Sequence, residues 1–278
     1  MALILEGRQV AAGVKARLQE KVEALRQQGI QCGLAVVRVG DDPASRVYTN
    51  ALVKLAGNIG LRADVRTLPG DMAEPGLLAV LGELNRDPGI HGILPMMPLP
   101  RHLDPDKVAE TICPDKDVDS LHPLNVGLVA AGKSRWAPCT PRAVMTILDH
   151  YSIKLEGKKV AIVGRSNVVG KPLFQLMLAR NATVTVCHSK TPDLVSVVRA
   201  ADVVVAAVGR PEMIGAAMIK PGAVVVDVGI NEVGGRLVGD VEFAAVEPVA
   251  RAITPVPGGV GAVSNVMVME AVLRHFAG

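Results

Sequence analysis

The chain has 278 residues, of which 49% are hydrophobic and 21% charged, so it can build one large or two smaller cores, and wholesale disorder is excluded. Its 30 basic and 27 acidic residues are well mixed, and only 2% of residues are aromatic, which argues against nucleic acid as a partner. Apolar runs such as Val203–Val208 are far shorter than the roughly 18 residues that span a bilayer, and the N-terminus lacks the pattern of a secretory signal. We therefore expect a cytoplasmic protein without a membrane contact.

The cysteines and histidines give little indication of a metal site. Four cysteines are widely spaced and form no CxxC pair, so we expect reduced thiols and no metal: Cys32, Cys113, Cys139 and Cys187. Three histidines could act as general bases, although roles on the surface or in loops are more common: His91, His102 and His122.

The first half of the chain alternates strand and helix patterns. We expect strands at Leu34–Val39, Arg62–Leu68 and Gly92–Met96, separated by helices at 45–59 and 75–84. Such a βαβαβ order favours a parallel sheet that is covered on both faces. A loop rich in proline and charge follows at 114–123. The next helix is expected over about 142–150, with Thr140 as its N-cap and Pro141 at its first position.

The second half repeats this alternation without an internal sequence repeat. Strands are expected at 159–163, 182–187, 202–208, 223–228 and 252–255, with helices at 171–179 and 192–200. An apolar helix over 264–276 ends the chain. The pattern predicts an α/β protein with two α/β units.

One strand-to-helix turn in the second unit carries the features of a phosphate site. The segment VAIVGRSNVVGKPL places Gly164 at the end of a strand and Gly170 near the start of a helix, whose free N–H groups could face a phosphate. The spacing is not GxGxxG, so a tight turn without a ligand also fits. The next strand ends in Cys187-His188-Ser189-Lys190-Thr191 with no acidic residue; together with Arg165 this set favours NADP over NAD, although a solvated polar loop is the alternative.

Glycine-rich turns recur where later strands end, at Gly209, at 227–231 and at 255–261. The carboxyl ends of strands line the ligand crevice of an open α/β sheet, so these turns are expected to face one ligand.

Several segments together resemble the bifunctional methylenetetrahydrofolate dehydrogenase/cyclohydrolase family, called FolD. They occur in the family order over nearly the whole chain: VGDDPASRVY (39–48), GILPMMPLP (92–100), PDKDVDSLHPLNVG (114–127), PCTPRAV (138–144), VGRSNVVGKPL (163–173), DVGIN (227–231) and ITPVPGGVG (253–261).

The resemblance implies two α/β domains that face a cleft. Residues 1–138 with the C-terminal helix 264–278 would bind folate, and residues 139–263 would form a Rossmann-like domain with a parallel sheet that binds NADP. It also implies a homodimer and tetrahydrofolate derivatives as ligands, in one-carbon metabolism. The family oxidises 5,10-methylenetetrahydrofolate with NADP⁺ and then hydrolyses the methenyl product to 10-formyltetrahydrofolate.

The resemblance also assigns site residues. Tyr48 and Asp119 match the family's pterin-contacting tyrosine and aspartate, although helix packing and loop solvation are common roles for such residues. The cofactor would be bound by Gly164, Arg165, Ser166, His188, Ser189, Gly209, Ile230, Gly258 and Gly259.

Two departures from the family pattern affect the chemistry. The family's catalytic lysine, four residues after the tyrosine, is Leu52 here, and its glutamine is Met96. Lys54 is two helical positions from Leu52, a turn of about 200°, so it should point elsewhere. Smaller departures are Ser120 in place of a glycine, and Ala262, Val263 and Ser264 in place of Pro-Met-Thr.

Oxidation of the methylene group requires alignment rather than proton transfer, whereas hydrolysis requires a base or an oriented donor. We therefore expect dehydrogenase activity with weak or absent cyclohydrolase activity. An altered substrate, a paralogue that binds folate and NADP without turnover, and simple packing changes at Leu52 and Met96 are the alternatives.

Overall fold

The computed structural model describes residues 1–133 and 136–276, and these form two compact units. The six-stranded unit comprises Met1–Gly13, Val129–Lys133 and Thr140–Ser264, and the three-stranded unit comprises Val14–Leu128, Ser134–Cys139 and Asn265–Gly278. Within the described residues, no helix is both long and apolar enough to cross a membrane. The α/β class with parallel sheets is confirmed.

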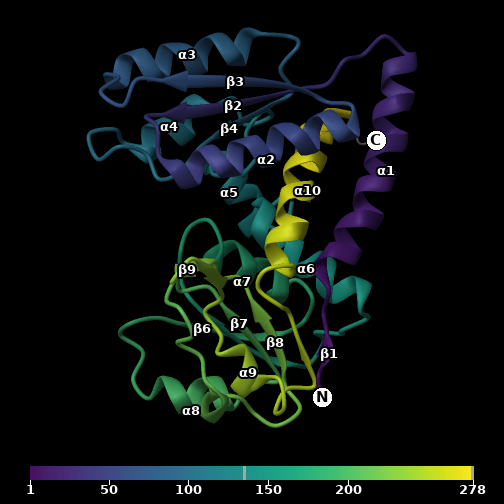
Figure 1. Ribbon diagram of the computed structural model, residues 1–278, viewed down its shortest axis with the longest axis vertical. Coiled ribbons are helices and arrows are strands. Elements are labelled where there is room, and N and C mark those ends of the chain that lie inside the picture. The colour runs from purple at the N-terminus through teal and green to yellow at the C-terminus, as the bar shows by residue number, and fades with distance from the viewer. Residues whose placement is uncertain (134–135, 277–278) are drawn as a thin grey trace. The chain divides into compact units, whose positions relative to one another are not determined.

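The three-stranded unit is a parallel sheet in the order β3-β2-β4, with helices on both faces (Figure 1). Its strands are β2 (Gly33–Val39), β3 (Arg62–Leu68) and β4 (Gly92–Pro95), and its helices include α2 (Pro43–Ile59), α3 (Glu74–Arg86) and α4 (Pro105–Thr111). Alternate residues of β2 face opposite sides of the sheet, and Ala35, Val37 and Val39 pack with leucines of α3 in one core cluster. Both faces of β2 are buried, which explains its continuous apolar sequence.

Helix α2 is defined at both ends by local sequence. Asp42 is its N-cap and accepts a hydrogen bond from the Ser45 backbone N–H at 2.7 Å, with Pro43 at the first position. Gly60 ends the helix in the left-handed conformation, with a φ of 98°. These caps fix which residues of α2 face the core: Ser45, Thr49, Leu52, Ala56 and Ile59.

The six-stranded unit is an all-parallel sheet in the order β1-β11-β8-β7-β5-β6. The strands are β1 (Leu3–Ile4), β5 (Lys159–Val163), β6 (Thr183–Cys187), β7 (Val203–Ala206), β8 (Val224–Asp227) and β11 (Ala252–Ile253). The chain runs from β5 outward to β6 and then returns to the other side of β5 to form β7. The strand order therefore reverses at β5, and ligands of open α/β sheets bind beside such a switch point.

Helices α7 (Gly170–Leu178), α8 (Leu194–Arg199) and α9 (Phe243–Val246) connect strands from β5 onward, and α6 (Cys139–His150) precedes β5. One core cluster joins Val198 of α8 and Val246 of α9 to the sheet through alternate strand residues, among them Val204 and Val225. A short antiparallel hairpin, β9 (Asn231–Val233) and β10 (Arg236–Val238), follows β8 and forms a separate two-stranded sheet.

The structure corrects two element boundaries. Helix α6 begins at Cys139, so Thr140 lies inside the helix and is not its N-cap. The C-terminal helix α10 runs over Val260–Val272, four residues earlier than expected at its start, and a separate 3₁₀ turn covers Arg274–Phe276. The small and apolar residues at 260–263 are compatible with either a helix or a turn. The preceding loop ends at Gly259, and the helix begins directly after it.

Elements that the sequence analysis did not identify include α1 (Gly7–Gln27), α4, α5 (Pro123–Ala130), α9, the hairpin and strand β1. Strand β1 pairs in parallel with β11 at the edge of the six-stranded sheet. The first residues of the chain therefore belong to the six-stranded unit, whereas the domain boundaries drawn from the family resemblance place them with the other sheet. The division into a folate-binding and an NADP-binding domain stays a prediction.

Candidate functional site

In the three-stranded unit, Asp119 lies close enough to Tyr48 for its charge to affect the ionisation of the phenol. Burial raises the pKa of the Asp119 carboxyl, and the charge of Asp117 acts in the same direction, while hydrogen bonds from Cys139 oppose them. Burial also raises the pKa of the Tyr48 phenol, followed by the effects of Asp119 and Cys139. Tyr48 still exposes 36% of its surface. The three side chains therefore form one polar cluster that is partly open at the tyrosine.

The loop that carries Asp119 is held by its neighbours. The buried Asp117 carboxylate accepts hydrogen bonds at 2.8 Å from the His122 backbone N–H and from the Asn125 side-chain amide. The Lys116 ammonium group donates to three carbonyl groups, those of Leu84, Asn85 and Asp87. These bonds hold the backbone on both sides of Asp119.

Ser120, next to Asp119, adopts an unusual backbone conformation. Its φ is 52°, in the left-handed region that a residue with a side chain rarely adopts, and it is 1% exposed. Its hydroxyl has no hydrogen-bond partner in the part of the chain that the structure describes. A glycine would adopt this conformation without strain.

Leu52 and Met96 are both buried. Leu52 is 0% exposed and lies on the core-facing side of α2, and Met96, directly after β4, is 6% exposed. Lys54, by contrast, is exposed, which agrees with its predicted rotation of about 200° from Leu52. On the same side of α2, the buried Thr49 hydroxyl has no partner among the described residues. The core-facing side of α2 is therefore apolar at Leu52, with one buried hydroxyl nearby along the helix.

In the six-stranded unit, the predicted cofactor residues gather at one edge of the sheet. Gly164 follows β5, His188 follows β6, Gly209 follows β7, Ile230 follows β8 and Gly258 follows β11. Because all these strands are parallel, their carboxyl ends meet at this edge. It is the edge at which the strand order reverses between β5 and its neighbours, as expected for a ligand crevice.

The first turn requires its glycines. Gly164 has a φ of 130°, and a Cβ there would lie 2.1 Å from the Ala207 carbonyl oxygen. A Cβ on Gly170 would lie 2.2 Å from the Gly164 carbonyl oxygen. The turn between β5 and α7 is therefore as tight as backbone contact permits. Among the described residues no side chain caps the N-terminus of α7. The Lys171 N–H donates to the Ser166 carbonyl oxygen at 3.1 Å and Pro172 has no N–H, so the Gly170 N–H is the donor in this turn that an anion could approach.

The turn after β6 carries donors but no acid. The Lys190 backbone N–H donates to His188 Nδ1 at 3.1 Å, so the ring's proton in the neutral form is on Nε2. Ser189 and Lys190 are exposed, as are Arg165 and Ser166 in the first turn. An exposed arginine, lysine and serine with a half-buried imidazole suit an anionic group, and they offer no carboxylate for a ribose hydroxyl pair.

A buried carboxylate that the sequence analysis did not single out holds the loop after β7. Asp240 is 0% exposed, and its Oδ2 accepts from the backbone N–H groups of Val208 at 2.6 Å and Gly209 at 3.0 Å. Its Oδ1 accepts from the Arg210 N–H at 2.9 Å and from the Asn231 side chain at 3.0 Å. Asp240 thus fixes Gly209 and the start of the hairpin together.

A second buried carboxylate, Asp227, lies beside it at the end of β8. Asp227 accepts hydrogen bonds from the N–H groups of Gly229, Asp240 and Val241 at 2.9 to 3.0 Å. Burial raises the pKa of Asp227 to about 6, against the effect of these three donors and with a smaller contribution from the charge of Asp240. Only the short spacing from Asp227 to Gly239-Asp240 in the sequence could have indicated this pair.

The last glycine-rich turn contacts the start of the chain. The Arg8 backbone N–H donates to the Gly258 carbonyl oxygen at 3.1 Å, and a Cβ on Gly7 would lie 2.0 Å from the Gly259 carbonyl oxygen. Gly258 has a φ of 110°, so the turn depends on glycine there.

The three histidines considered as general bases have structural contacts. His91 Nδ1 accepts from the Gly33 backbone N–H at 3.2 Å, and His122 Nδ1 accepts from the Leu124 N–H at 3.1 Å. His102 Nε2 lies 3.0 Å from the Met72 carbonyl oxygen. These contacts organise loops and helix starts of the three-stranded unit.

Comparisons with known proteins match both halves of the chain. Residues 5–119 match the catalytic domain of tetrahydrofolate dehydrogenase/cyclohydrolase, and residues 138–277 match its NAD(P)-binding domain. The bifunctional protein FolD of Geotalea uraniireducens is 51% identical over 275 residues, which cover 99% of this chain and 98% of that protein.

Two solved structures are similar over nearly the whole chain. The bifunctional FolD enzyme from Campylobacter jejuni has a TM-score of 0.97 and 42% identity, covering 99% of this chain and 98% of that one. The Trypanosoma brucei FolD, solved with NADP and an inhibitor, has a TM-score of 0.93 and 37% identity, covering 98% and 96%.

Proposed function

This chain belongs to the tetrahydrofolate dehydrogenase/cyclohydrolase family, and on that premise we propose that it oxidises 5,10-methylenetetrahydrofolate to 5,10-methenyltetrahydrofolate with NADP⁺. The second family reaction, hydrolysis of the methenyl product to 10-formyltetrahydrofolate, is weak or absent. The observation that carries this division is the fully buried, apolar side chain of Leu52, one helical turn after Tyr48 on α2.

The folate site is assigned to the cluster of Tyr48 and Asp119. The phenol ring, which remains 36% exposed, offers a surface on which a pterin ring can stack. The Asp119 carboxylate can accept hydrogen bonds from the N–H groups at the pterin edge. Its pKa is raised by burial, so a ligand with N–H donors would favour the ionised form and gain from the contact.

The carboxyl edge of the six-stranded sheet fits NADP. The glycines of the turn after β5 allow backbone and the start of α7 to approach a pyrophosphate, because a Cβ at Gly164 or Gly170 would collide with backbone. Arg165, His188 and Ser189 would bind the 2′-phosphate, since no acid in this turn repels it. Gly209, held by Asp240, and Ile230, Gly258 and Gly259 would line the rest of the cofactor site.

The oxidation step requires little from the protein except geometry. The bound nicotinamide supplies the acceptor for the hydride. As the hydride leaves, the methylene carbon becomes a cation that is delocalised over N5 and N10 of the folate, and no proton has to move at that step. Tyr48 and Asp119 would hold the pterin in place, and the glycine-rich turns would hold the cofactor, so catalysis rests on positioning.

Hydrolysis has a different requirement. Water must add to the methenyl carbon, and a side chain must accept or direct a proton. We propose that Leu52 and Met96 occupy the positions at which the family has a lysine and a glutamine. Both are buried apolar side chains that can neither accept a proton nor orient a water. Lys54 is exposed and cannot replace the amine from its position on α2.

The same apolar pair supports a second candidate, a paralogue that binds a folate and NADP with an altered substrate or without turnover. A pocket whose polar pair has been replaced by leucine and methionine would favour a less polar ligand. Binding of both ligands without formation of NADPH from methylenetetrahydrofolate would favour this candidate.

The experiment compares both reactions in one set of variants. Formation of NADPH from methylenetetrahydrofolate and loss of methenyltetrahydrofolate are measured for the wild type and for Leu52→Lys/Met96→Gln. We expect oxidation in both proteins, and hydrolysis that rises in the double variant by up to the ~10²–10⁴-fold typical of general acid–base catalysis. Lys54→Ala is the matched control, because it removes an exposed lysine from the same helix and should leave both rates unchanged.

We also propose that the protein is a homodimer, as the family resemblance implies. The hairpin β9–β10 supports this, because Val233 and Leu237 are 50% and 49% exposed on a two-stranded sheet. A partner chain would cover this apolar surface, and light scattering of the purified protein at working concentration would show twice the chain mass.

A further inference from the structure

A cavity of about 580 Å³ lies at the amino edge of the six-stranded sheet, opposite the edge that carries the cofactor residues. Lys158 immediately precedes β5, Asp202 precedes β7, Ala223 precedes β8 and Arg251 precedes β11. Because the strands are parallel, these positions meet at one end of the sheet, and all belong to the six-stranded unit. The cavity is therefore separate from the proposed cofactor site by the length of the strands.

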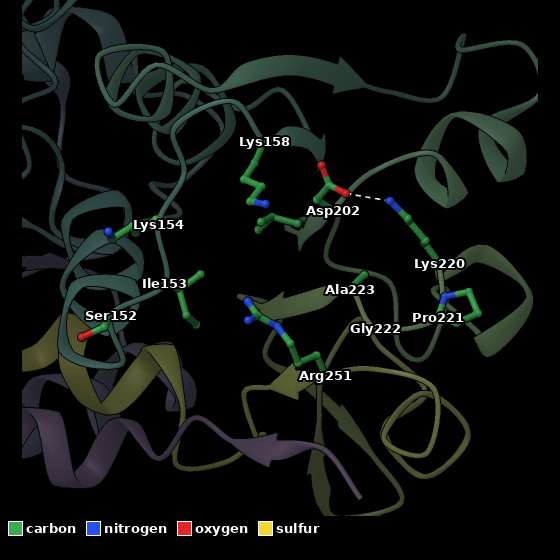
Figure 2. A pocket seen from close by; sticks show the side chains of 11 residues that line it. Ser152, Ile153, Lys154, Lys158, Asp202, Lys220, Pro221, Gly222, Ala223 and Arg251 are labelled. Carbon is green, nitrogen blue, oxygen red and sulfur yellow. Dashed lines mark hydrogen bonds and ion pairs between the residues drawn. The ribbon is translucent and has the colours of Figure 1, made fainter.

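Cations dominate the lining of this cavity. Four basic side chains contribute to it, Lys154, Lys158, Lys220 and Arg251, against the single carboxylate of Asp202. Figure 2 shows Lys158 and Arg251 extending toward the same space from opposite sides. The carboxylate is already engaged, since it accepts from the Lys220 ammonium group at 2.7 Å and from the Lys159 backbone N–H at 3.0 Å.

Lys158 acts on the Asp202 carboxyl without a short contact: the hydrogen bond from Lys220 lowers the pKa of Asp202 most, and the charge of Lys158 adds to this effect. In the described part of the chain, Lys154, Lys158 and Arg251 form no ion pair, whereas Lys220 is paired with Asp202. Like charges that surround one cavity repel each other, and a multivalent anion placed among them would relieve that repulsion.

The lining also defines the chemical class of a ligand. No aromatic side chain is among the lining residues, so a nucleobase would have no surface on which to stack. The backbone N–H groups of Gly222, Ala223 and Arg251 already donate to the carbonyl oxygens of Val249, Lys220 and Ala223. A ligand would therefore be bound mainly by the long basic side chains, with the Ser152 hydroxyl as a further donor. This arrangement suits a flexible chain of phosphates more than a heterocycle.

We propose that this cavity is a binding site for a small oligophosphate, with Lys158 and Arg251 as its principal contacts. This site does not depend on the proposed enzymatic function, because none of its residues belongs to the folate or cofactor sites.

The test is calorimetric titration of the full-length protein with inorganic tripolyphosphate, without nucleotide. We expect saturable binding that weakens at least tenfold in Lys158→Ala/Arg251→Ala. The control Lys15→Ala/Arg17→Ala removes the same charge from helix α1 and should retain the wild-type affinity. Asp202→Asn should bind more tightly, because it removes the only carboxylate of the lining.

Four results would overturn the proposal. The first is the absence of saturable tripolyphosphate binding, and the second is an equal loss of affinity in the two double variants, which would indicate a diffuse charge effect. Loss of binding in Arg165→Ala with wild-type affinity in Lys158→Ala/Arg251→Ala would place the anion at the cofactor edge. A tricarboxylate titrated in parallel distinguishes a phosphate site from a site for any polyanion, and equal affinity for both would contradict the assignment to phosphate.

Discussion

Replacing Asp240 by asparagine should destabilise the protein more than removing an ion pair on the surface, because Asp240 holds the loop after β7. Each carboxylate oxygen of Asp240 accepts two N–H donors, at distances between 2.6 and 3.0 Å. An asparagine keeps one oxygen, and whichever way its amide is turned, two N–H groups then face an NH₂ group. Hydrogen bonds to charged groups contribute about 1.5–3 kcal/mol each, so two lost bonds correspond to a loss of about 3–6 kcal/mol.

Relief of repulsion with Asp227 reduces this loss, so we expect Asp240→Asn to lower the free energy of unfolding by about 3 kcal/mol. The affinity for NADP⁺ should fall by tenfold or more, because Gly209 is released. Denaturant unfolding and calorimetric titration with NADP⁺ measure the two effects. The control is Asp149→Asn, which removes an exposed ion pair with Arg180 and should cost less than about 1 kcal/mol. An Asp240→Asn protein with wild-type stability and wild-type NADP⁺ affinity would refute this reasoning.

Further predictions concern the neighbouring carboxylate, two glycines and the folate site. The pKa of Asp227 is raised to about 6 in the folded protein, so the folded state retains this proton as the pH rises above the unfolded pKa of about 3.9. The free energy of unfolding should therefore fall by roughly 3 kcal/mol as the pH rises from about 4 to about 6. Denaturation curves of wild type and Asp227→Asn should diverge in that window, and parallel curves would contradict the assignment. Gly239→Ala should destabilise the protein by about 2 kcal/mol or more, because its Cβ would lie 1.8 Å from Asp227 Oδ2. Gly57→Ala should stabilise it by about 0.5–1 kcal/mol, because a Cβ inside α2 would meet open space there. Thermal unfolding that ranks the two variants in the opposite order would be inconsistent with this packing. Asp119→Asn should raise the KM for methylenetetrahydrofolate with little change for NADP⁺, and steady-state kinetics would show the reverse if Asp119 served the cofactor instead.

Much of the fold was predictable from local sequence patterns. The strands over 34–39 and 159–163 are apolar runs bounded by turns, and their apolar continuity reflects burial on both faces. The strand over 62–68 alternates polar and apolar residues instead, and it lies partly exposed at the edge of its sheet. The end of helix α2 could be placed because Gly60 is a strong C-cap signal, whereas its start was expected at 45, two residues after the start that Asp42 and Pro43 define. In these places the local preference and the tertiary environment agree.

Other elements depend on information that is not local. Strand β1 has only two residues and exists because β11 offers an unpaired edge, which no sequence window reveals. Helix α1 was missed although its buried positions recur at helical spacing: Val10, Val14, Leu18, Val22 and Leu25. The boundary of α10 was misplaced because glycines at its start are compatible with either a turn or a helix.

The candidate sites show the same division. Gly164, Gly209 and Gly258 were identified because glycine is visible in the sequence where a turn needs a positive φ. Asp240 was not identified, because a lone Asp after a glycine resembles any surface turn, and its four donors come from segments 9 to 32 residues away. The proximity of Tyr48, Asp119 and Cys139 likewise needs the three-dimensional structure.

The most direct measurement is the ratio of methenyltetrahydrofolate hydrolysis to methylenetetrahydrofolate oxidation in the unmodified protein. We predict oxidation that depends on NADP⁺. We also predict that hydrolysis exceeds the uncatalysed rate only slightly. Hydrolysis at a rate that matches oxidation, in a protein whose Leu52 and Met96 are intact, would contradict the division between the two reactions.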